Sequence, residues 1–113
     1  TCIRDYIHVM DLAEGHVRAL DWMQRQVDAA ALTVNLGTGR GHSVQELVQA
    51  FEAASGQSIA CEVAAPRPGE VSSVYAEASL ARDALAWQAR RPLHAMCADA
   101  WRWAVNSRAS IAA

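Results

Sequence analysis

The sequence predicts a small α/β domain of short strands and about four helices, with parallel pairing of the strands. Short apolar runs rich in β-branched residues alternate with longer segments whose apolar residues recur at helical spacing. An apolar run at 32–36, a capped helix and a further run at 58–64 follow one another directly, which is typical of a strand-helix-strand unit. The 113 residues amount to one domain, and no repeat or linker divides them.

The first third of the chain predicts a strand followed by a helix. Residues 2–9 are rich in β-branched and aromatic side chains, which favour a strand. Asp11, with Glu14 three residues later, can cap the helix that follows. Its expected buried face is Leu12, His16, Leu20, Met23 and Val27. We interpret His16 as a packed, hydrogen-bonded core histidine rather than a ligand.

The middle of the chain predicts a buried strand, a glycine-rich loop and a second helix. The strand at 32–36 leads into the loop at 37–41. Ser43 and Glu46 then have the spacing of a capping box, and Gly56 is placed to end the helix.

The last third predicts an extended segment and two helices. Residues 71–76 are extended, Ser79 caps a short helix that ends near Leu85, and Pro92 suits the first turn of the final helix. The apolar face of that helix is Leu93, Met96, Cys97, Ala100, Trp101, Ala104 and Val105. From Asn106 onward the pattern stops, so we expect a frayed tail.

The composition of the chain indicates which binding partners are unfavourable and in which cellular compartment the protein is expected. Ten basic and twelve acidic residues give a net charge of −2 without a run of like charge, which argues against nucleic acid and anionic membranes as partners. No apolar run approaches the length of a membrane span, and no signal pattern opens the chain. Cys2, Cys61 and Cys97 show no Cys-x-x-Cys spacing, which indicates free thiols in a reducing cytoplasm. Because Thr1 opens directly into an apolar run without a methionine, we expect a piece of a longer protein.

Residues for catalysis and metal binding do not form a recognisable set. The glycines of the 37–41 loop resemble the start of a G-x-G-x-x-G fingerprint, but position 42 is His42, so a structural turn and a ligand loop both stay open. The four histidines lack metal-ligand spacing, and no G-x-S-x-G elbow is present. The sequence has no lysine, so it cannot contain a Tyr-x-x-x-Lys pair. We therefore assign no catalytic residue and no metal ligand.

The segment Ala65-Pro66-Arg67-Pro68-Gly69-Glu70 is the best candidate for a ligand contact. Each proline biases the residue before it toward an extended conformation, and Pro68-Gly69 matches the central pair of a type II turn. Arg67 offers a planar fork of donors and Glu70 an acceptor, which suits a ligand with phosphate and hydroxyl groups. A surface turn with solvated charges is the alternative.

Taken in order, several sequence blocks resemble the C-terminal portion of the UDP-glucose 4-epimerases, which are extended short-chain dehydrogenase/reductases. The blocks are R-D-Y-I-H-V at 4–9, D-L-A with G-H at 11–16, N-L-G-T-G at 35–39, R-P-G-E at 67–70 and D-A-W-R-W at 99–103. The resemblance covers about residues 2–107. It implies a C-terminal nucleotide-sugar-binding segment at 1–107, and the end of the apolar pattern predicts a disordered tail at 108–113.

The resemblance implies roles for five side chains. Arg4 and Arg67 correspond to arginines that contact the UDP diphosphate or its nucleoside. Glu70 stands where the family more often has an aspartate that holds the ribose hydroxyls. Tyr6 either supports the nucleotide pocket or is a packed strand aromatic. Val74 matches the position that faces the hexose, and its intermediate size leaves the preference for an N-acetyl group open.

The resemblance also implies what this chain lacks. In the family, NAD oxidises C4 of the hexose and returns hydride to the opposite face. The NAD-binding half and the Tyr-x-x-x-Lys pair lie upstream of the matched blocks, so NAD belongs to the complete enzyme and none is expected to bind this chain alone. We expect at most weak binding of a UDP-hexose and a homo-oligomer formed through exposed apolar surface. The alternative is a non-enzymatic α/β interaction module derived from that family.

Overall fold

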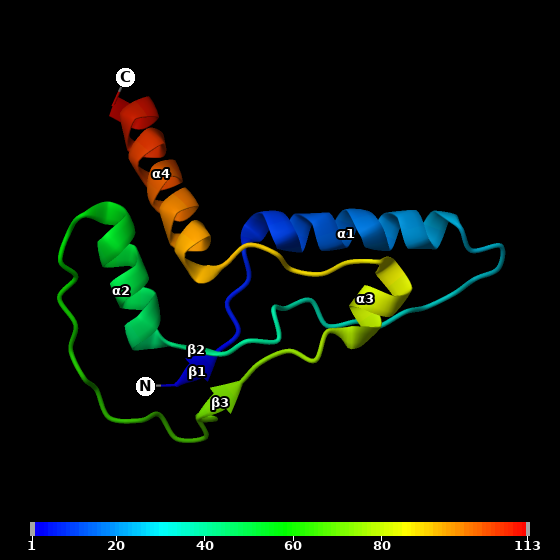
Figure 1. Ribbon diagram of the computed structural model, residues 1–113, viewed down its shortest axis with the longest axis horizontal. Coiled ribbons are helices and arrows are strands. Elements are labelled where there is room, and N and C mark those ends of the chain that lie inside the picture. The colour runs from blue at the N-terminus through cyan, green and yellow to red at the C-terminus, as the bar shows by residue number, and fades with distance from the viewer. Residues whose placement is uncertain (1, 113) are drawn as a thin grey trace.

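Residues 2–112, which this computed structural model describes, form four helices around a small sheet (Figure 1). The helices are α1 (Val9–Gln24), α2 (Val44–Ser55), α3 (Ser79–Leu85) and α4 (Leu93–Ala112), and the strands are β1 (Ile3–Arg4), β2 (His42–Ser43) and β3 (Ser73–Val74). α2 packs against α4 on one side of the sheet, and α1 packs against α3 on the other. The predicted α/β class is confirmed.

The sheet is mixed rather than parallel. Its strand order is β2-β1-β3, with β1 antiparallel to β2 and parallel to β3. Arg4 pairs with His42 on one side and with Val74 on the other. The prediction of parallel pairing is therefore correct for β1 and β3 only. Each strand is two residues long, so the sheet joins distant segments but supplies little of the buried surface.

Three predicted strands are shortened or missing. The strand expected at 2–9 consists of Ile3–Arg4 only. Residues 32–36 and 58–64 form no strand. Leu32, Val34 and Leu36 nevertheless pack against the core, so their apolar character reflects burial and not pairing. The 58–64 segment is exposed throughout, because no neighbouring strand or helix of the described chain covers it.

The start of α1 differs from the prediction. His8, and not Asp11, is the N-cap residue, since its Nδ1 accepts a hydrogen bond of 3.0 Å from the Met10 amide. Asp11 lies in the first turn with a fully buried side chain. The capping pattern from Asp11 to Glu14 is thus misleading, because both carboxylates bind groups far along the chain.

The predicted buried face of α1 is also wrong. The side chains of Leu20 and Met23 are about half exposed and that of Val27 is almost fully exposed. His16 is exposed as well, and its Nδ1 lies 2.8 Å from the Leu12 carbonyl oxygen. The packed face of α1 carries the small residue Gly15 instead, together with Ala19 and Trp22.

The core lies where α1 meets α3 and the segment after it. It is formed by Ala81, Leu85 and Trp87, with Ile7, Ala19, Trp22, Leu32, Val34, Leu36 and Ala89 packed around them. Gly15 permits this close approach, because a Cβ atom there would lie 2.9 Å from Leu36 Cδ1 and 3.2 Å from the Trp87 ring. The Trp87 indole donates a hydrogen bond of 2.9 Å to the Asp11 carbonyl oxygen, which satisfies its buried N–H.

The predicted ends of α2 are confirmed. The Glu46 amide donates to Ser43 Oγ over 3.1 Å, and the Ser43 amide donates to the Glu46 carboxylate over 2.6 Å, which completes the capping box. Gly56 ends the helix with φ +67°, a left-handed conformation that glycine adopts without a steric penalty.

The ends of α3 and α4 follow the prediction less closely. Ala78 precedes α3 as the N-cap, and Ser79 is the first helical residue, whose hydroxyl donates to Glu77. α4 begins directly after Pro92, as expected, but runs to Ala112, past the point at Asn106 where the apolar pattern ends. Alanine and arginine favour helix without requiring burial. The division of the chain at residue 107 stays a prediction.

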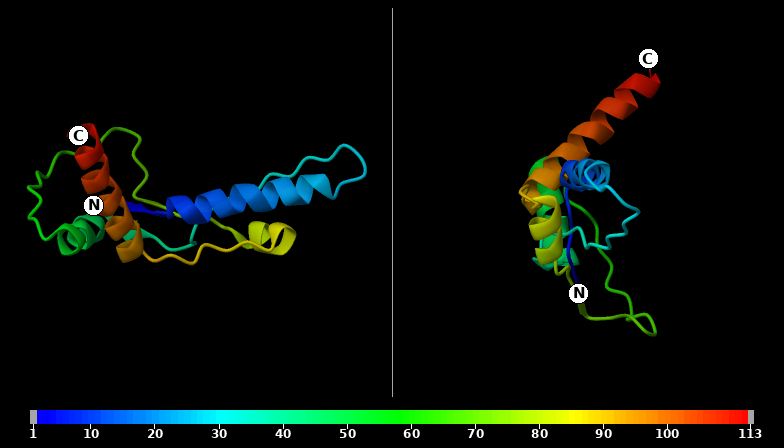
Figure 2. Two further views of the ribbon diagram at one scale, coloured as in Figure 1. Left: turned by 90° about the horizontal axis from the view of Figure 1, so that it is seen from above. Right: turned by 90° about the vertical axis from the view of Figure 1, so that its right-hand side faces the viewer.

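The shape of the chain is open. Its radius of gyration is 17.5 Å and its extents are 53 × 43 × 22 Å. A compact domain of this length has a radius of gyration of about 13 Å. Figure 2 shows the reason: α1 with α3 and α2 with α4 form two separate pairs, and long connecting segments run between them. The core cluster around Trp87 therefore lies with the α1–α3 pair, whereas the buried Cys97 belongs to α4.

Candidate functional site

Four of the five side chains that the sequence singles out lie near the sheet. Arg4 belongs to β1, and Val74 lies opposite it on β3. An Arg4 Nη2 atom lies 3.7 Å from Glu70 Oε1, and Arg4 Nη1 donates to the Ile3 carbonyl oxygen over 2.8 Å. The Arg4 and Glu70 side chains are about one-third exposed, so solvent and ligands can reach both. We call Arg4, Arg67, Glu70 and Val74 the sheet-edge cluster.

A tight turn brings Arg67 and Glu70 together. The Glu70 amide donates to the Arg67 carbonyl oxygen over 3.1 Å, and Gly69 has φ +80°. This is the type II turn predicted for Pro68-Gly69. The Arg67 amide in turn lies 3.4 Å from the Glu70 carboxylate, at the long end of hydrogen-bond distance.

Glu70 is held in its charged form. A hydrogen bond from the Cys2 thiol, the Arg67 amide, and the positive charges of Arg67 and Arg4 together keep the pKa of the Glu70 carboxyl below its usual value. No pattern in the sequence indicates the hydrogen bond from Cys2 to Glu70, because the two residues are 68 positions apart. A carboxylate at this position can accept hydrogen bonds from hydroxyl groups of a ligand.

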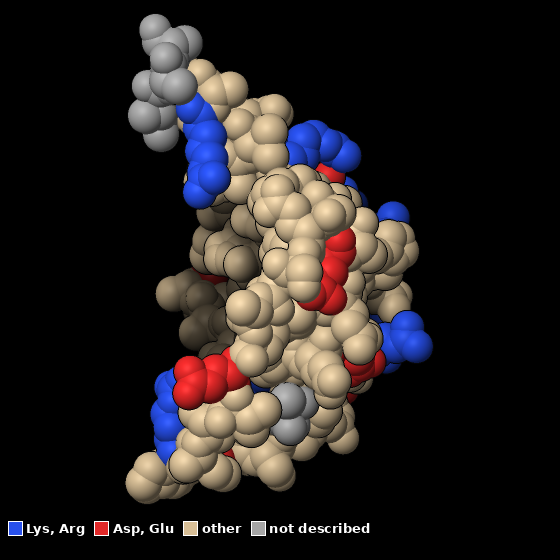
Figure 3. All heavy atoms as spheres, turned by 90° about the vertical axis from the view of Figure 1, so that its left-hand side faces the viewer, with Lys and Arg blue, Asp and Glu red and all other residues tan. Residues whose placement is uncertain are grey.

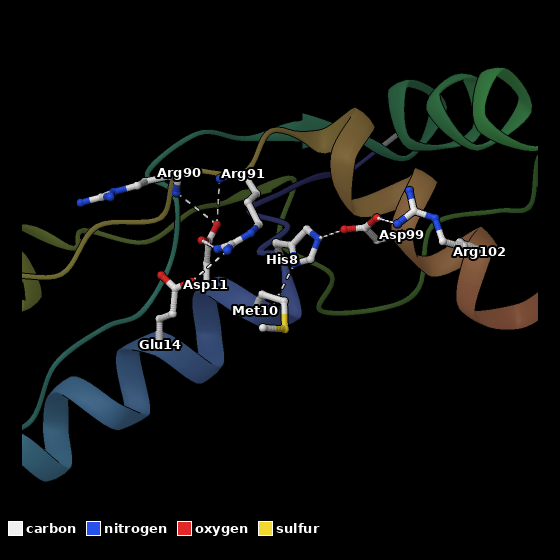
Figure 4. Close-up of polar contacts among 8 residues, drawn as sticks. All are labelled: His8, Met10, Asp11, Glu14, Arg90, Arg91, Asp99 and Arg102. Carbon is white, nitrogen blue, oxygen red and sulfur yellow. Dashed lines mark hydrogen bonds and ion pairs between the residues drawn. The ribbon is translucent and has the colours of Figure 1, made fainter. Parts of the chain in front are cut away.

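Tyr6 lies in a different part of the structure. It lines an apolar groove between the start of α1, α2 and α4, with a volume of about 800 Å³. His8 and Asp99 also line this groove. Because Met10 donates to Nδ1 of His8, the proton of the ring is on Nε2, which donates to Asp99 over 3.1 Å. Arg102 holds the other oxygen of Asp99 at 3.1 Å (Figure 4).

Asp5 explains the glycine-rich loop. Its carboxylate accepts hydrogen bonds from the amides of Thr38, Gly39 and Ala76 at 2.9 to 3.1 Å, and from the Thr38 hydroxyl. Burial acts to raise the pKa of Asp5, but these bonds outweigh it and hold the pKa below its usual value. A Cβ atom on Gly37 would lie 2.7 Å from the same carboxylate. The loop is thus a structural turn that binds an internal anion.

Asp11 joins α1 to the segment that leads into α4. Its carboxylate accepts hydrogen bonds from the amides of Arg90 and Arg91 at 3.1 and 2.9 Å and pairs with the Arg91 guanidinium, which also binds Glu14 (Figure 4). Burial acts to raise the pKa of Asp11, but the amides of Arg91 and Arg90 and the Arg91 guanidinium lower it. The sequence showed neither this role nor that of Asp5.

Metal and membrane sites are not evident in the described part of the chain. Within residues 2–112, no group of three His, Cys, Asp or Glu side chains could hold a metal ion, and no described helix is both long and apolar enough to cross a membrane. Charged side chains are scattered over the face drawn in Figure 3, most of which is uncharged. All three cysteines are free, and burial raises the pKa of the Cys97 thiol.

Comparison with known proteins shows which proteins this chain is similar to. No protein-family model matches the chain. A UDP-glucose 4-epimerase of Bacillus subtilis is 50% identical over 103 residues, which are 91% of this chain and 30% of that protein. The Caenorhabditis elegans UDP-glucose 4-epimerase is 48% identical over 103 residues, which again are 91% of this chain and 30% of that protein. The chain matches the C-terminal portion of the UDP-glucose 4-epimerases. It spans about 30% of the length of these curated relatives.

Solved epimerases have the same fold over this portion. The epimerase from Stenotrophomonas maltophila, solved with NAD and formylated UDP-arabinopyranose, matches with a TM-score of 0.87 and 46% identity over 96% of this chain and 32% of that one. The Bifidobacterium longum epimerase, solved with NAD+ and UDP, matches with a TM-score of 0.85 and 39% identity. That match covers 96% of this chain and 31% of the epimerase chain. The predicted fold, a C-terminal portion of an extended short-chain dehydrogenase/reductase, is confirmed.

The residues of this chain do not fit NAD. The glycine-rich loop is the only part of the sequence that resembles a dinucleotide fingerprint, and its amides at Thr38 and Gly39 already donate to Asp5. A pyrophosphate would have to displace the partly buried Asp5 carboxylate from these amides. We therefore assign no step of a reaction to NAD in this chain.

Proposed function

We propose that this chain is the UDP-sugar-binding C-terminal segment of an epimerase of this kind and is not catalytically complete by itself. The observation that supports the proposal most directly is the sheet-edge cluster. Segments separated by more than 60 residues bring two arginines, a carboxylate and Val74 together on the side of the sheet where β1 pairs with the edge strand β3. Arginine suits phosphate because its planar fork can donate two hydrogen bonds to it.

Each member of the cluster has a proposed role. Arg4 and Arg67 bind the diphosphate or its nucleoside, and Glu70, kept ionised by its surroundings, accepts hydrogen bonds from the ribose hydroxyls. Val74 faces the hexose from its position beside Arg4. Tyr6 follows β1, outside the strand, and from the groove wall it supports the nucleotide pocket. In this proposal the NAD-dependent chemistry belongs to the part of a full-length epimerase that lies outside the matched region.

Titration calorimetry with UDP tests the binding role. We expect weak binding by the chain and at least a tenfold loss of affinity in Arg67→Ala, because a charge-assisted hydrogen bond contributes about 1.5–3 kcal/mol. Arg82→Ala is the matched control, since Arg82 is exposed, lies outside the sheet-edge cluster and pairs with its neighbour Asp83. An affinity for UDP that is the same in all three proteins would contradict the proposal.

We also propose that the isolated chain forms a homo-oligomer in the cytoplasm. Large apolar side chains on α1 are exposed, among them Val9, Val17 and Leu20, and surfaces of this kind favour association. The free thiols suit a reducing compartment. Sedimentation velocity at micromolar concentration should show a dimer or larger species, and a monomer there would contradict the proposal. A purely non-enzymatic module is not favoured, because the charged cluster is retained.

A further inference from the structure

The Asp5 carboxylate joins three separate segments of the chain. It follows β1 directly and accepts hydrogen bonds from the Thr38 and Gly39 amides of the glycine-rich loop. It also accepts a hydrogen bond of 3.1 Å from the amide of Ala76, which follows β3. A Cβ atom on Gly37 would lie 2.4 Å from the Ala76 Cβ atom, so the loop and the segment after β3 are closely packed around this carboxylate. Loss of the Asp5 charge would therefore release the end of β3 as well as the loop.

β3 depends on such anchors because it is short and lies at the edge of the sheet. It has two residues, and within the described sheet it pairs with β1 alone. Before the strand, the Ile3 amide donates to the Ser72 carbonyl oxygen over 2.8 Å. After the strand, the Asn35 side chain donates to the Glu77 carbonyl oxygen over 3.2 Å, at an exposed position. Between these two bonds, the partly buried carboxylate of Asp5 holds the end of the strand itself.

The position of Val74 follows from this anchor. Val74 is the last residue of β3, pairs with Arg4 and is half exposed, so a ligand can reach it. A single residue, Tyr75, separates it from Ala76. Because Arg4 and Asp5 are consecutive, one short stretch of chain holds both an arginine of the sheet-edge cluster and the segment that carries Val74. A small displacement of a supporting residue is enough to weaken a binding contact.

We propose that Asp5 is a positioning residue for the hexose, because through the Ala76 amide it places Val74 at the sheet-edge cluster. This inference rests on the proposed function, since it requires a UDP-hexose bound at that cluster. Both carboxylate oxygens of Asp5 accept hydrogen bonds from the chain itself, so Asp5 acts through the backbone and not on the ligand. Arg67 and Glu70 precede β3 and are held by their own turn. Loss of Asp5 should therefore weaken the grip on the hexose more than the grip on UDP.

Titration calorimetry with two ligands, UDP and UDP-glucose, tests this role on the chain itself. In the unaltered chain the hexose should add affinity, so that UDP-glucose binds more tightly than UDP. Asp5→Asn should remove most of this difference. We expect its affinity for UDP-glucose to fall at least about threefold more than its affinity for UDP, because the contact to the hexose is misplaced. A role in stability alone would lower both affinities by the same factor.

Three further variants separate positioning from stability. Thr38→Val removes a hydroxyl that donates to Asp5 from the loop, but it leaves the bond to the segment after β3 in place. Asp11→Asn removes a buried carboxylate that binds the 90–91 backbone and not β3. Both should unfold at a lower urea concentration than the unaltered chain and keep its ratio of the two affinities. Asn35→Ala removes the exposed anchor on the Glu77 carbonyl and should change the ratio in the same direction as Asp5→Asn.

Several results would overturn the positioning role. Equal losses for UDP and UDP-glucose in Asp5→Asn, or a changed ratio in Asp11→Asn, would show that Asp5 only stabilises the fold. An unaltered chain that binds UDP-glucose no more tightly than UDP would show that it makes no contact to the hexose, while its binding of UDP would stand. An unaltered chain that binds neither ligand would contradict the proposed function and the positioning role together. If Asp5→Asn does not fold, an unchanged ratio in Asn35→Ala would be decisive against the role.

Discussion

Asp11→Asn is expected to lower the free energy of unfolding by about 2–3 kcal/mol, because it removes the charge of a buried, hydrogen-bonded carboxylate. The Asp11 side chain is fully buried and accepts hydrogen bonds from two amides and a guanidinium. Removal of one partner from a fully buried ion pair costs about 3–5 kcal/mol. We expect a smaller loss for Asp11→Asn, because the Arg91 side chain is 35% exposed and water can solvate it once the carboxylate is gone. Urea unfolding followed by tryptophan fluorescence measures the loss.

Glu14→Gln is the matched control for this substitution. Glu14 binds the same guanidinium at 2.9 Å, but its side chain is half exposed. Exposed ion pairs contribute little to stability, so the midpoint of unfolding should hardly change. Equal losses in the two variants would show that the guanidinium contact, and not the buried hydrogen bonds to the 90–91 backbone, carries the stabilisation.

Asp5→Asn should be almost as destabilising, by about 2 kcal/mol. One carboxylate oxygen of Asp5 accepts hydrogen bonds from Gly39 and Ala76, and the other accepts from the Thr38 hydroxyl. An asparagine has an NH₂ group in place of one of these oxygens, and that group would face N–H donors. The loop at 37–39 and the segment after β3 would then lose the anion that holds them together. Chemical unfolding and amide exchange at Gly39 and Ala76 measure this effect.

The pH dependence of stability provides a separate check on Asp5. The pKa of its carboxyl is lowered in the folded chain, so its contribution is fully present above the pKa of an unfolded aspartate, about 3.9. The contribution is lost as the pH falls from there through the lower folded value. The Asp5→Asn variant should therefore lose less stability than the parent chain between pH 4 and pH 2. Asp83→Asn, at an exposed position, should retain the parent profile.

Sequence reasoning succeeded where a signal and its effect lie within a few residues of each other. The capping box at Ser43 and Glu46, the left-handed Gly56 and the turn at Pro68-Gly69 are all local, and all were predicted. The order of the sequence blocks also identified the epimerase C-terminal portion, because five short motifs in the right order are specific even when each alone is not.

Sequence reasoning failed where the partner is distant. The apolar residues of α1 have helical spacing on more than one face, and the packed face is chosen by Gly15, which lets Trp87 approach from 72 positions away. The run at 32–36 looked like a strand because burial and strand pairing select the same side chains. Asp11 looked like a cap because Ser, Thr, Asp and Asn are preferred there, whereas its real partner lies 80 positions along the chain.

The sequence by itself determined the class of fold, the ends of α2 and the epimerase resemblance, since these depend on local backbone preferences and on motif order. Only the tertiary structure decided that the amides of the glycine loop bind Asp5, that Arg4 and Glu70 meet, and that an apolar groove is left uncovered. Each of these features needs two segments to approach within a few ångströms. That approach is set by the packing of the whole chain, and no local pattern of residues records it.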